Sequence, residues 1–233
     1  MNGSLHGPIE GIFFDLGWTL VKPSSGHWLF SDAAERYLAD YPDRKKVYAT
    51  MEKHWGDLHS ENHLWLSYKQ EYAAFYEAYR RTSQMLELGW SEKVLGELTE
   101  DIVYSENFYQ VYDGVPALLE RLAGRYKLGV ISDTVPTVGE RLHRLGLLKY
   151  FSSVTLSCHL NARKPAPKMF AHALLASGVP GERAVFVDDL EGNLDAAGKL
   201  GFQGVQICAG PFVVRSERHL TIDNICEIEQ LLL

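Results

Sequence analysis

Short apolar runs alternate with helical patterns from residue 112 onward, and this alternation limits the possible folds more than any other feature of the chain. The pattern predicts strands at 127–132, 153–156, 184–187 and 204–207, and helices at 138–145, 167–176 and 193–200. Gly146 and Gly201 stand where two of these helices should end. Strands separated by helices usually form a parallel sheet with helices on both faces. The expected fold class is therefore α/β, with a Rossmann-like parallel-sheet core.

Residues 25–105 differ in composition and pattern from the rest of the chain, with many helix formers, few strand signals and many aromatic side chains. This stretch predicts an inserted helical unit. We expect a core domain made of residues 1–22 and 106–233, and a helical domain made of residues 23–105. The aromatic side chains fall mostly at helical spacings, which indicates that they pack the core of the insert. In the alternative interpretation, some of them line a substrate pocket.

Composition excludes several classes of partner. The 233 residues carry a formal charge of −7, so no basic patch for nucleic acid or an anionic membrane surface is expected. No apolar run is long enough to span a membrane, and the N-terminus does not resemble an export signal. Cys158, Cys208 and Cys226 are an odd and scattered set, which suggests neither disulfides nor a zinc site and favours a cytoplasmic location.

Chemically reactive side chains stand at or soon after the ends of the predicted strands, where an open α/β sheet places its ligand crevice. They are Asp15, Ser132, Lys164, Asp188 and Asp189. A carboxylate can attack phosphorus only when the repulsion between two anions is relieved, and a divalent cation and a lysine can relieve it. Carboxylate and carbonyl oxygens are suitable ligands for Mg²⁺. Together these residues predict a phosphoryl-transfer site.

Four segments resemble the motifs of the haloacid dehalogenase superfamily, in the branch that carries a helical cap after the first motif. They are FFDLGWTL, VISDTVP, SCHLNARKPAPKMF and VFVDDLEGNLDAA, in that order. The resemblance covers essentially the whole chain and implies that the 23–105 insert is the helical cap. It also implies a fold of the type found in that superfamily.

The resemblance assigns a role to each candidate residue. Asp15 would be the nucleophile, while Ser132 and Lys164 would hold the phosphate. The catalytic set is Asp15, Ser132 and Lys164; the substrate-binding set is Ser132, Asp133, Lys164 and Trp18; the Mg²⁺ set is Asp15, Gly17, Asp188 and Asp189. Gly17 would contribute its backbone carbonyl.

Gly17 is the main departure from the family pattern. Phosphatases of this superfamily usually carry a second aspartate at that position, which protonates the leaving oxygen and then activates water. Loss of a general acid/base costs about 10²- to 10⁴-fold in rate. Glycine would keep the carbonyl ligand but remove the proton shuttle. The histidines of the insert, His27, His54, His59 and His63, offer a substitute shuttle, although a structural role is favoured for all four; His27 ranks first because it follows the first motif closely.

The expected function is a Mg²⁺-dependent phosphatase that hydrolyses a small phosphomonoester through an aspartyl-phosphate intermediate, slowly because of Gly17. The expected partner is a small phosphorylated metabolite, and the expected state is a monomer or weak homodimer. Three alternatives stay open: a 2-haloacid dehalogenase, a phosphonate hydrolase, and a non-catalytic protein that binds phosphate and metal. The dehalogenase would need an arginine in the cap, for which the insert offers Arg36, Arg44, Arg80 and Arg81. The phosphonate hydrolase would need a cap lysine, for which the candidates are Lys45, Lys46, Lys53 and Lys69.

Overall fold

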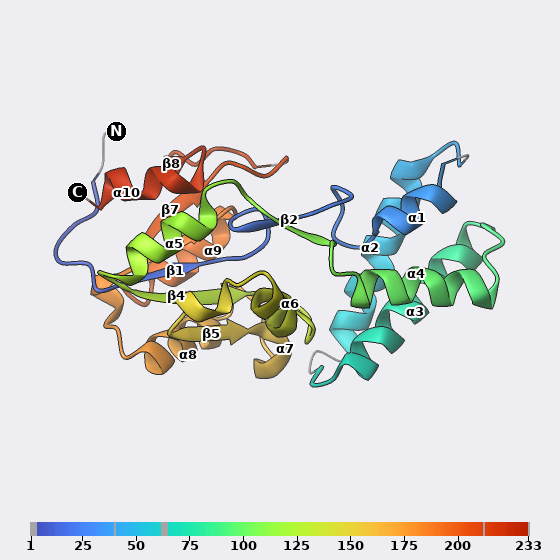
Figure 1. Cartoon of the computed structure of the whole chain (residues 1–233), viewed down its shortest axis with the longest axis horizontal. Helices are drawn as coiled ribbons and strands as arrows, with labels where there is room; N and C mark the ends of the chain where they lie inside the picture. Colours follow the sequence, from blue (N-terminus) through green and yellow to red (C-terminus); the bar gives the residue numbers. More distant parts are fainter. Residues whose placement is uncertain (1–3, 40, 62–64, 212, 233) are drawn as a thin grey trace. The chain divides into compact units, whose positions relative to one another are not determined.

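The computed structural model describes residues 4–39, 41–61, 65–211 and 213–232. These residues divide into two compact units. The α/β unit takes the described residues of Met1–Lys22, Val111–Thr134 and Leu142–Leu233. The helical unit takes the described residues of Pro23–Gln110 together with Val135–Arg141. Figure 1 shows the elements of each unit coloured along the chain.

The described part of the α/β unit contains a six-stranded sheet in the order β5-β4-β1-β6-β7-β8, with every neighbouring pair parallel. The strands are β1 (Gly11–Phe14), β4 (Lys127–Ser132), β5 (Ser153–Leu156), β6 (Ala184–Asp188), β7 (Gln203–Ile207) and β8 (Leu220–Ile222). Every residue of β1 and β6 is buried, as expected for central strands of a parallel sheet that is covered on both faces. The predicted α/β fold class is confirmed.

Helices flank this sheet (Figure 1). They are α5 (Val115–Ala123), α7 (Ser157–Leu160), α8 (Pro167–Ser177), α9 (Glu191–Gly198) and α10 (Ile228–Leu231), with 3₁₀ turns at Leu148–Tyr150, Gly181–Arg183 and Ile225–Glu227. Helix α6 (Val138–Arg144) begins in the helical unit and ends in the α/β unit. Rings from β1, β6, α8 and the turn after α9 meet in one buried cluster. Its edge-to-face pairs include Phe13 with Phe202, at a centroid distance of 5.4 Å, and Phe170 with Phe186, at 5.6 Å. This cluster packs α8 and the turn after α9 against the central strands β1 and β6.

The helical unit is built from α1 (Asp32–Tyr37), α2 (Arg44–Glu61), α3 (Tyr68–Met85) and α4 (Glu92–Tyr104). Ser67 caps α3 by accepting a hydrogen bond from the Gln70 amide, and Ser91 caps α4 in the same way. Many of its aromatic side chains pack into its own core; Trp55, for example, stacks on Phe75 with ring centroids 4.1 Å apart. Short strands β2 (Val21–Pro23) and β3 (Tyr109–Val111) pair where the chain passes from one unit to the other.

This division differs from the expected domain boundaries in two places. Residues 106–110 group with the helical unit, and so do Val135–Arg141, which the sequence assigned to the core. The side chains of the second segment account for the difference. Thr137 donates through its amide and hydroxyl to the carboxylate of Glu71, and Arg141 donates to the carbonyls of Ile102 and Val103.

No helix in the described ranges combines the length and the apolar character that a membrane crossing requires.

Candidate active site

The sheet order places the ends of three strands side by side. Phe14, the last residue of β1, is paired with Val130 of β4 on one side and with Val187 of β6 on the other. Asp15 therefore leaves the central strand between the ends of its two neighbours. The Asp15 amide donates to the Val187 carbonyl at 2.9 Å, which extends the pairing by one residue.

A tight turn follows Asp15. The carbonyl of Leu16 accepts hydrogen bonds from the amides of Leu20, at 2.9 Å, and Val21, at 3.0 Å, and the Trp18 amide donates to Val21. Trp18 itself has a φ of 57°, a left-handed conformation that bulky residues rarely adopt. The turn thus imposes strain on Trp18 and holds Asp15 at the strand end.

Lys164 lies between two carboxylates. Its Nζ is 2.7 Å from Oδ1 of Asp15 and 2.7 Å from Oδ2 of Asp188. All three side chains are buried. Burial alone would lower the pKa of Lys164, but the charges of Asp15 and Asp188 outweigh it and raise the pKa above its usual value. Lys164 is therefore a permanent cation at this strand edge.

The Lys164 backbone is fixed from the end of β4. Its amide donates to Oδ1 of Asp133 at 2.9 Å, so this carboxylate, expected at the substrate, already serves to position the lysine. Burial raises the pKa of Asp133. Ser132, just before it, is buried at the last position of β4. The following residue, Thr134, is held through its amide by the Ser157 hydroxyl at 2.8 Å.

Asp188 is fully buried and heavily hydrogen-bonded. Besides Lys164, it accepts hydrogen bonds from the Leu190 amide, at 2.8 Å, and from Nδ2 of Asn193, at 2.9 and 3.1 Å. Burial still raises the pKa of Asp188 to about 6, with a further increase from Asp15. Burial and then the charges of Asp15 and Asp188 raise the pKa of Asp189 to about 7. Two carboxylates thus share one ammonium group, and their charges raise the pKa of Asp189 beside them; pKa shifts of this kind are typical of functional sites.

This donor set suits a hard divalent cation. Within the described ranges, no group of three or more His, Cys, Asp or Glu side chains lies together as metal ligands. Mg²⁺ is nevertheless commonly held by only one or two carboxylates, with water and substrate oxygens completing its octahedron. Asp15 and Asp188 supply two carboxylates at one lysine, and the mutual repulsion of carboxylates here is what a cation would relieve.

The candidate proton shuttle His27 belongs to the helical unit and has local partners there. Its Nδ1 accepts from the Leu29 amide at 3.1 Å, and its Nε2 lies 3.4 Å from Oε1 of Glu52. The ring stacks on Tyr48, and burial lowers the pKa of His27. These contacts give the imidazole a structural role within its own unit.

Three of the four candidate cap arginines are also engaged within the helical unit. Arg44 pairs with Glu35 at 3.0 Å, while Arg80 and Arg81 both contact Glu77 at 2.7 Å. A dehalogenase that used one of these arginines to hold a carboxylate substrate would have to break one of these ion pairs.

Two further residues near the site have no role in the sequence analysis. Asn193 provides the amide that binds both oxygens of Asp188. Gln206 is buried in β7 and donates to the backbone carbonyl of Asp189 at 3.1 Å. No motif marks Gln206, because a glutamine within a strand has no characteristic spacing.

Comparisons with known proteins show which family the chain is similar to. The sequence profile of the haloacid dehalogenase-like hydrolases matches residues 9–201. A glyceraldehyde 3-phosphate phosphatase of Methanopyrus kandleri is 32% identical over 102 residues, which is 43% of this chain and 44% of that protein. The alignment therefore spans less than half of either protein.

Solved structures show the same fold. A 2-haloacid dehalogenase from Pseudomonas syringae pv. Tomato is 22% identical with a TM-score of 0.65, and the match covers 96% of this chain and 98% of that one. A phosphatase from Thermococcus onnurineus is 22% identical with a TM-score of 0.58 and the same coverage. The expectations of the superfamily and of an enzyme are both confirmed. The chain belongs to the haloacid dehalogenase-like hydrolases.

Proposed function

We propose that this hydrolase is a Mg²⁺-dependent phosphatase that acts on a small phosphomonoester and uses Asp15 as its nucleophile. The observation that carries the proposal is Lys164, whose ammonium lies 2.7 Å from both Asp15 and Asp188. An attacking carboxylate and an incoming phosphate repel each other, and a buried cation beside the nucleophile reduces that repulsion. The phosphatase names of the partial relatives support the same reaction class.

The reaction would proceed in two steps on Asp15. Its carboxylate oxygen attacks phosphorus, the ester oxygen leaves with the bonding electrons, and an aspartyl phosphate forms. Lys164 neutralises charge on the phosphoryl oxygens, and the Ser132 hydroxyl donates to one of them. Water then attacks the acyl phosphate, which releases phosphate and restores the carboxylate.

Bound Mg²⁺ would add charge neutralisation at the phosphoryl group. Its proposed ligands are the carboxylates of Asp15 and Asp188 and the carbonyl oxygen of Gly17, while Asp189 would orient the ligands around it. Because Gly17 has no side chain, the leaving oxygen would take its proton from water. Both steps should therefore be slow.

We further propose that the helical unit is the cap that selects the substrate, and that the enzyme works in the cytoplasm as a monomer or weak homodimer. None of the three cysteines is joined in a disulfide, which suits a reducing compartment.

Phosphate release from a panel of small phosphomonoesters tests the proposal, with and without Mg²⁺, in the native enzyme and in Asp15→Asn. We expect release that depends on Mg²⁺ and falls to background in the variant. Equal release from both proteins would overturn the role of Asp15. Halide release from 2-chloropropanoate without phosphate release would instead identify a dehalogenase.

A further inference from the structure

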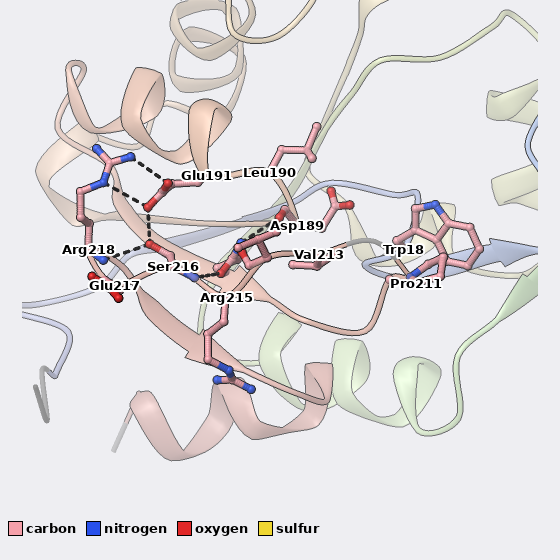
Figure 2. Close-up of a pocket in the computed structure, with 13 residues that line it drawn as sticks. Trp18, Asp189, Leu190, Glu191, Pro211, Val213, Arg215, Ser216, Glu217 and Arg218 are labelled. Atoms are coloured by element: carbon pink, nitrogen blue, oxygen red, sulfur yellow. Dashed lines mark hydrogen bonds and ion pairs between the residues drawn. The ribbon is translucent and has the colours of Figure 1, made fainter. Parts of the chain in front are cut away.

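A pocket of about 770 Å³ opens beside Asp189, entirely within the α/β unit. Figure 2 shows Trp18 and Pro211 at one end and Glu191, Ser216 and Arg218 at the other. The wall between them comes mainly from residues 210–211 and 213–218, called here the β7–β8 segment. Pockets of about 300–1,000 Å³ are the usual size for small organic ligands.

Much of the lining is apolar. Trp18, Pro211 and Val213 lie toward one end, and Gly210 brings the segment close to Trp18, since a Cβ at Gly210 would lie 3.2 Å from Cβ of Trp18. Leu190 and Val214 also line the pocket and are 58% and 85% exposed. Exposed apolar side chains gathered at a pocket indicate that something covers them.

Gln206 fixes this wall to the catalytic region. Its buried Nε2 donates to the carbonyls of Asp189, at 3.1 Å, and Val214, at 3.0 Å, while its Oε1 accepts from the Ser216 amide at 2.6 Å. One side chain thus binds both Asp189 and the wall. These hydrogen bonds fix the position of the pocket wall relative to the strand end that carries Asp188 and Asp189.

The two arginines of the lining are already neutralised. Arg218 lies 2.9 Å from carboxylate oxygens of both Glu191 and Asp195. Arg215 pairs with Asp223, and Figure 2 shows its side chain directed away from Asp189. Of the three carboxylates in the lining, Glu191 is itself the partner of Arg218, so the negative charge that faces an incoming group comes from Asp189 and Glu217. An organic anion would therefore meet like charge here, while an uncharged or cationic group would not.

We propose that this pocket binds the organic group of the phosphomonoester and selects apolar groups that are uncharged or cationic over groups that carry a second anion. This inference rests on the proposed function, because it takes Asp15 as the site of phosphoryl transfer. It adds a specificity-determining surface outside the helical unit, made by Trp18 and the β7–β8 segment.

The test uses three matched esters: butyl phosphate, and the same chain ending in a carboxylate or in an ammonium group. We expect kcat/KM for the neutral and cationic esters to exceed that for the anionic ester at least about tenfold. Equal values for the three esters would overturn the inference and leave the phosphatase proposal intact.

A lysine placed in the wall should change this preference. Val213→Lys should bring kcat/KM for the anionic ester to within about threefold of the neutral one, because it adds a positive charge to the lining. Leu175→Lys is the matched control, since Leu175 is 84% exposed on α8 and is not among the residues that line the pocket. An unchanged preference in Val213→Lys, or the same change in both variants, would contradict the inference.

Gln206→Met should raise KM for butyl phosphate more than it lowers kcat, since it frees the wall from Asp189. Gln203→Met is its control on the same strand, because Gln203 also holds two backbone groups, the amide and carbonyl of His6, away from the pocket. Equal effects of the two variants would reduce Gln206 to a structural role and contradict its part in the pocket.

Binding separates this inference from the proposed reaction. The affinities of butylphosphonate and its carboxylate-ended and ammonium-ended counterparts, measured by calorimetry, need no turnover. The same order of preference is expected. If no ester is hydrolysed but the order holds, the reaction proposal fails and the pocket stands; if the carboxylate-ended phosphonate binds as tightly as the others, the pocket inference fails.

Discussion

Both units of this protein bury charged side chains, but they satisfy them in different ways. In the α/β unit, Lys164 is shared by Asp15 and Asp188, and the pKa of Asp188 is raised to about 6 by burial and by Asp15. In the helical unit, Glu71 accepts two hydrogen bonds from Thr137, at 2.9 and 2.7 Å. Crowded like charges therefore distinguish the reactive cluster from a carboxylate that serves to hold a segment in place.

Arg141 strengthens this contrast. Its Nη2 donates to the carbonyls of Ile102, at 2.6 Å, and Val103, at 2.8 Å, and its guanidinium lies 5.2 Å from the ring of Phe108 and 4.8 Å from that of Tyr109. These are contacts to carbonyls and ring faces, not to a reactive group. A buried charged side chain does not by itself identify a catalytic site. Like charges that stay close together in the folded protein, and so shift each other's pKa values, are the better indicator.

The largest effect should come from removing the shared cation. Lys164→Met leaves Asp15 and Asp188 buried without their common partner, and loss of one partner of a buried ion pair costs about 3–5 kcal/mol. Phosphate release should fall to background. Chemical denaturation at pH 7 and pH 5 measures the free energy of unfolding.

The pH dependence of that loss follows from the raised pKa of Asp188. A carboxyl group whose pKa is higher in the folded state favours folding when protonated. Lys164 lowers the pKa of Asp188, so its removal raises that pKa further, and the penalty in Lys164→Met should shrink as the pH falls from 7 to 5. Lys168→Met, an exposed lysine on α8, is the control and should change neither property. A penalty that is equal at both pH values would show that the two carboxylates do not repel each other.

The next largest effect concerns the missing proton shuttle. Gly17→Asp should raise the rate of phosphate release about 10²- to 10⁴-fold, since that is the usual contribution of a general acid/base. Gly17→Asn has nearly the same size but cannot transfer the proton, so it should not give this increase. A decrease in the rate of Gly17→Asp would show that the candidate active site uses the space beside Gly17 for another purpose.

The smallest effect should come from the structural carboxylate. Glu71→Ala leaves the two Thr137 donors without their acceptor and should lower the free energy of unfolding by about 1–3 kcal/mol, a typical cost for such a buried group. Turnover by the folded enzyme should stay within about threefold of the native value, because Glu71 does not belong to the charge cluster. Glu100→Gln, at an exposed position of α4, serves as the control.

Titration checks the same residue independently. Burial raises the pKa of Glu71, so its protonated form favours folding and the native protein should gain stability as the pH falls from 7 toward 4.5. Glu71→Gln should gain less stability than the native protein, because only the gain from other carboxyl groups with raised pKa values, such as Asp188 and Asp189, remains. If its unfolding free energy follows the native pH dependence, Glu71 is not the group that titrates.

The sequence predicted the parts of the fold that depend on local pattern. Buried strands, glycine-terminated helices and carboxylates at strand ends are periodic or positional signals, and parallel pairing then brings Asp15, Lys164 and Asp188 together. Contacts between distant residues gave no such signal. Thr137 belongs to the helical unit because Glu71, 66 residues earlier in the chain, accepts its hydrogen bonds.

Two features of the candidate site could not be read from pattern for the same reason. The left-handed backbone of Trp18 follows from the hydrogen bonds of its turn, not from any preference of tryptophan. Gln206 matters because its amide meets Asp189, Val214 and Ser216 in space. Neither arrangement produces a residue spacing that can be recognised in the sequence.

The most direct test of the central claim is to trap the phosphoryl group on Asp15. The enzyme is mixed with Mg²⁺ and a phosphomonoester that it hydrolyses, quenched in acid, digested, and analysed by mass spectrometry of the peptide that contains Asp15. We predict phosphorylation at Asp15. Phosphate release with no phosphoryl group on Asp15, under conditions that trap it in a known aspartyl-phosphate enzyme, would contradict the account.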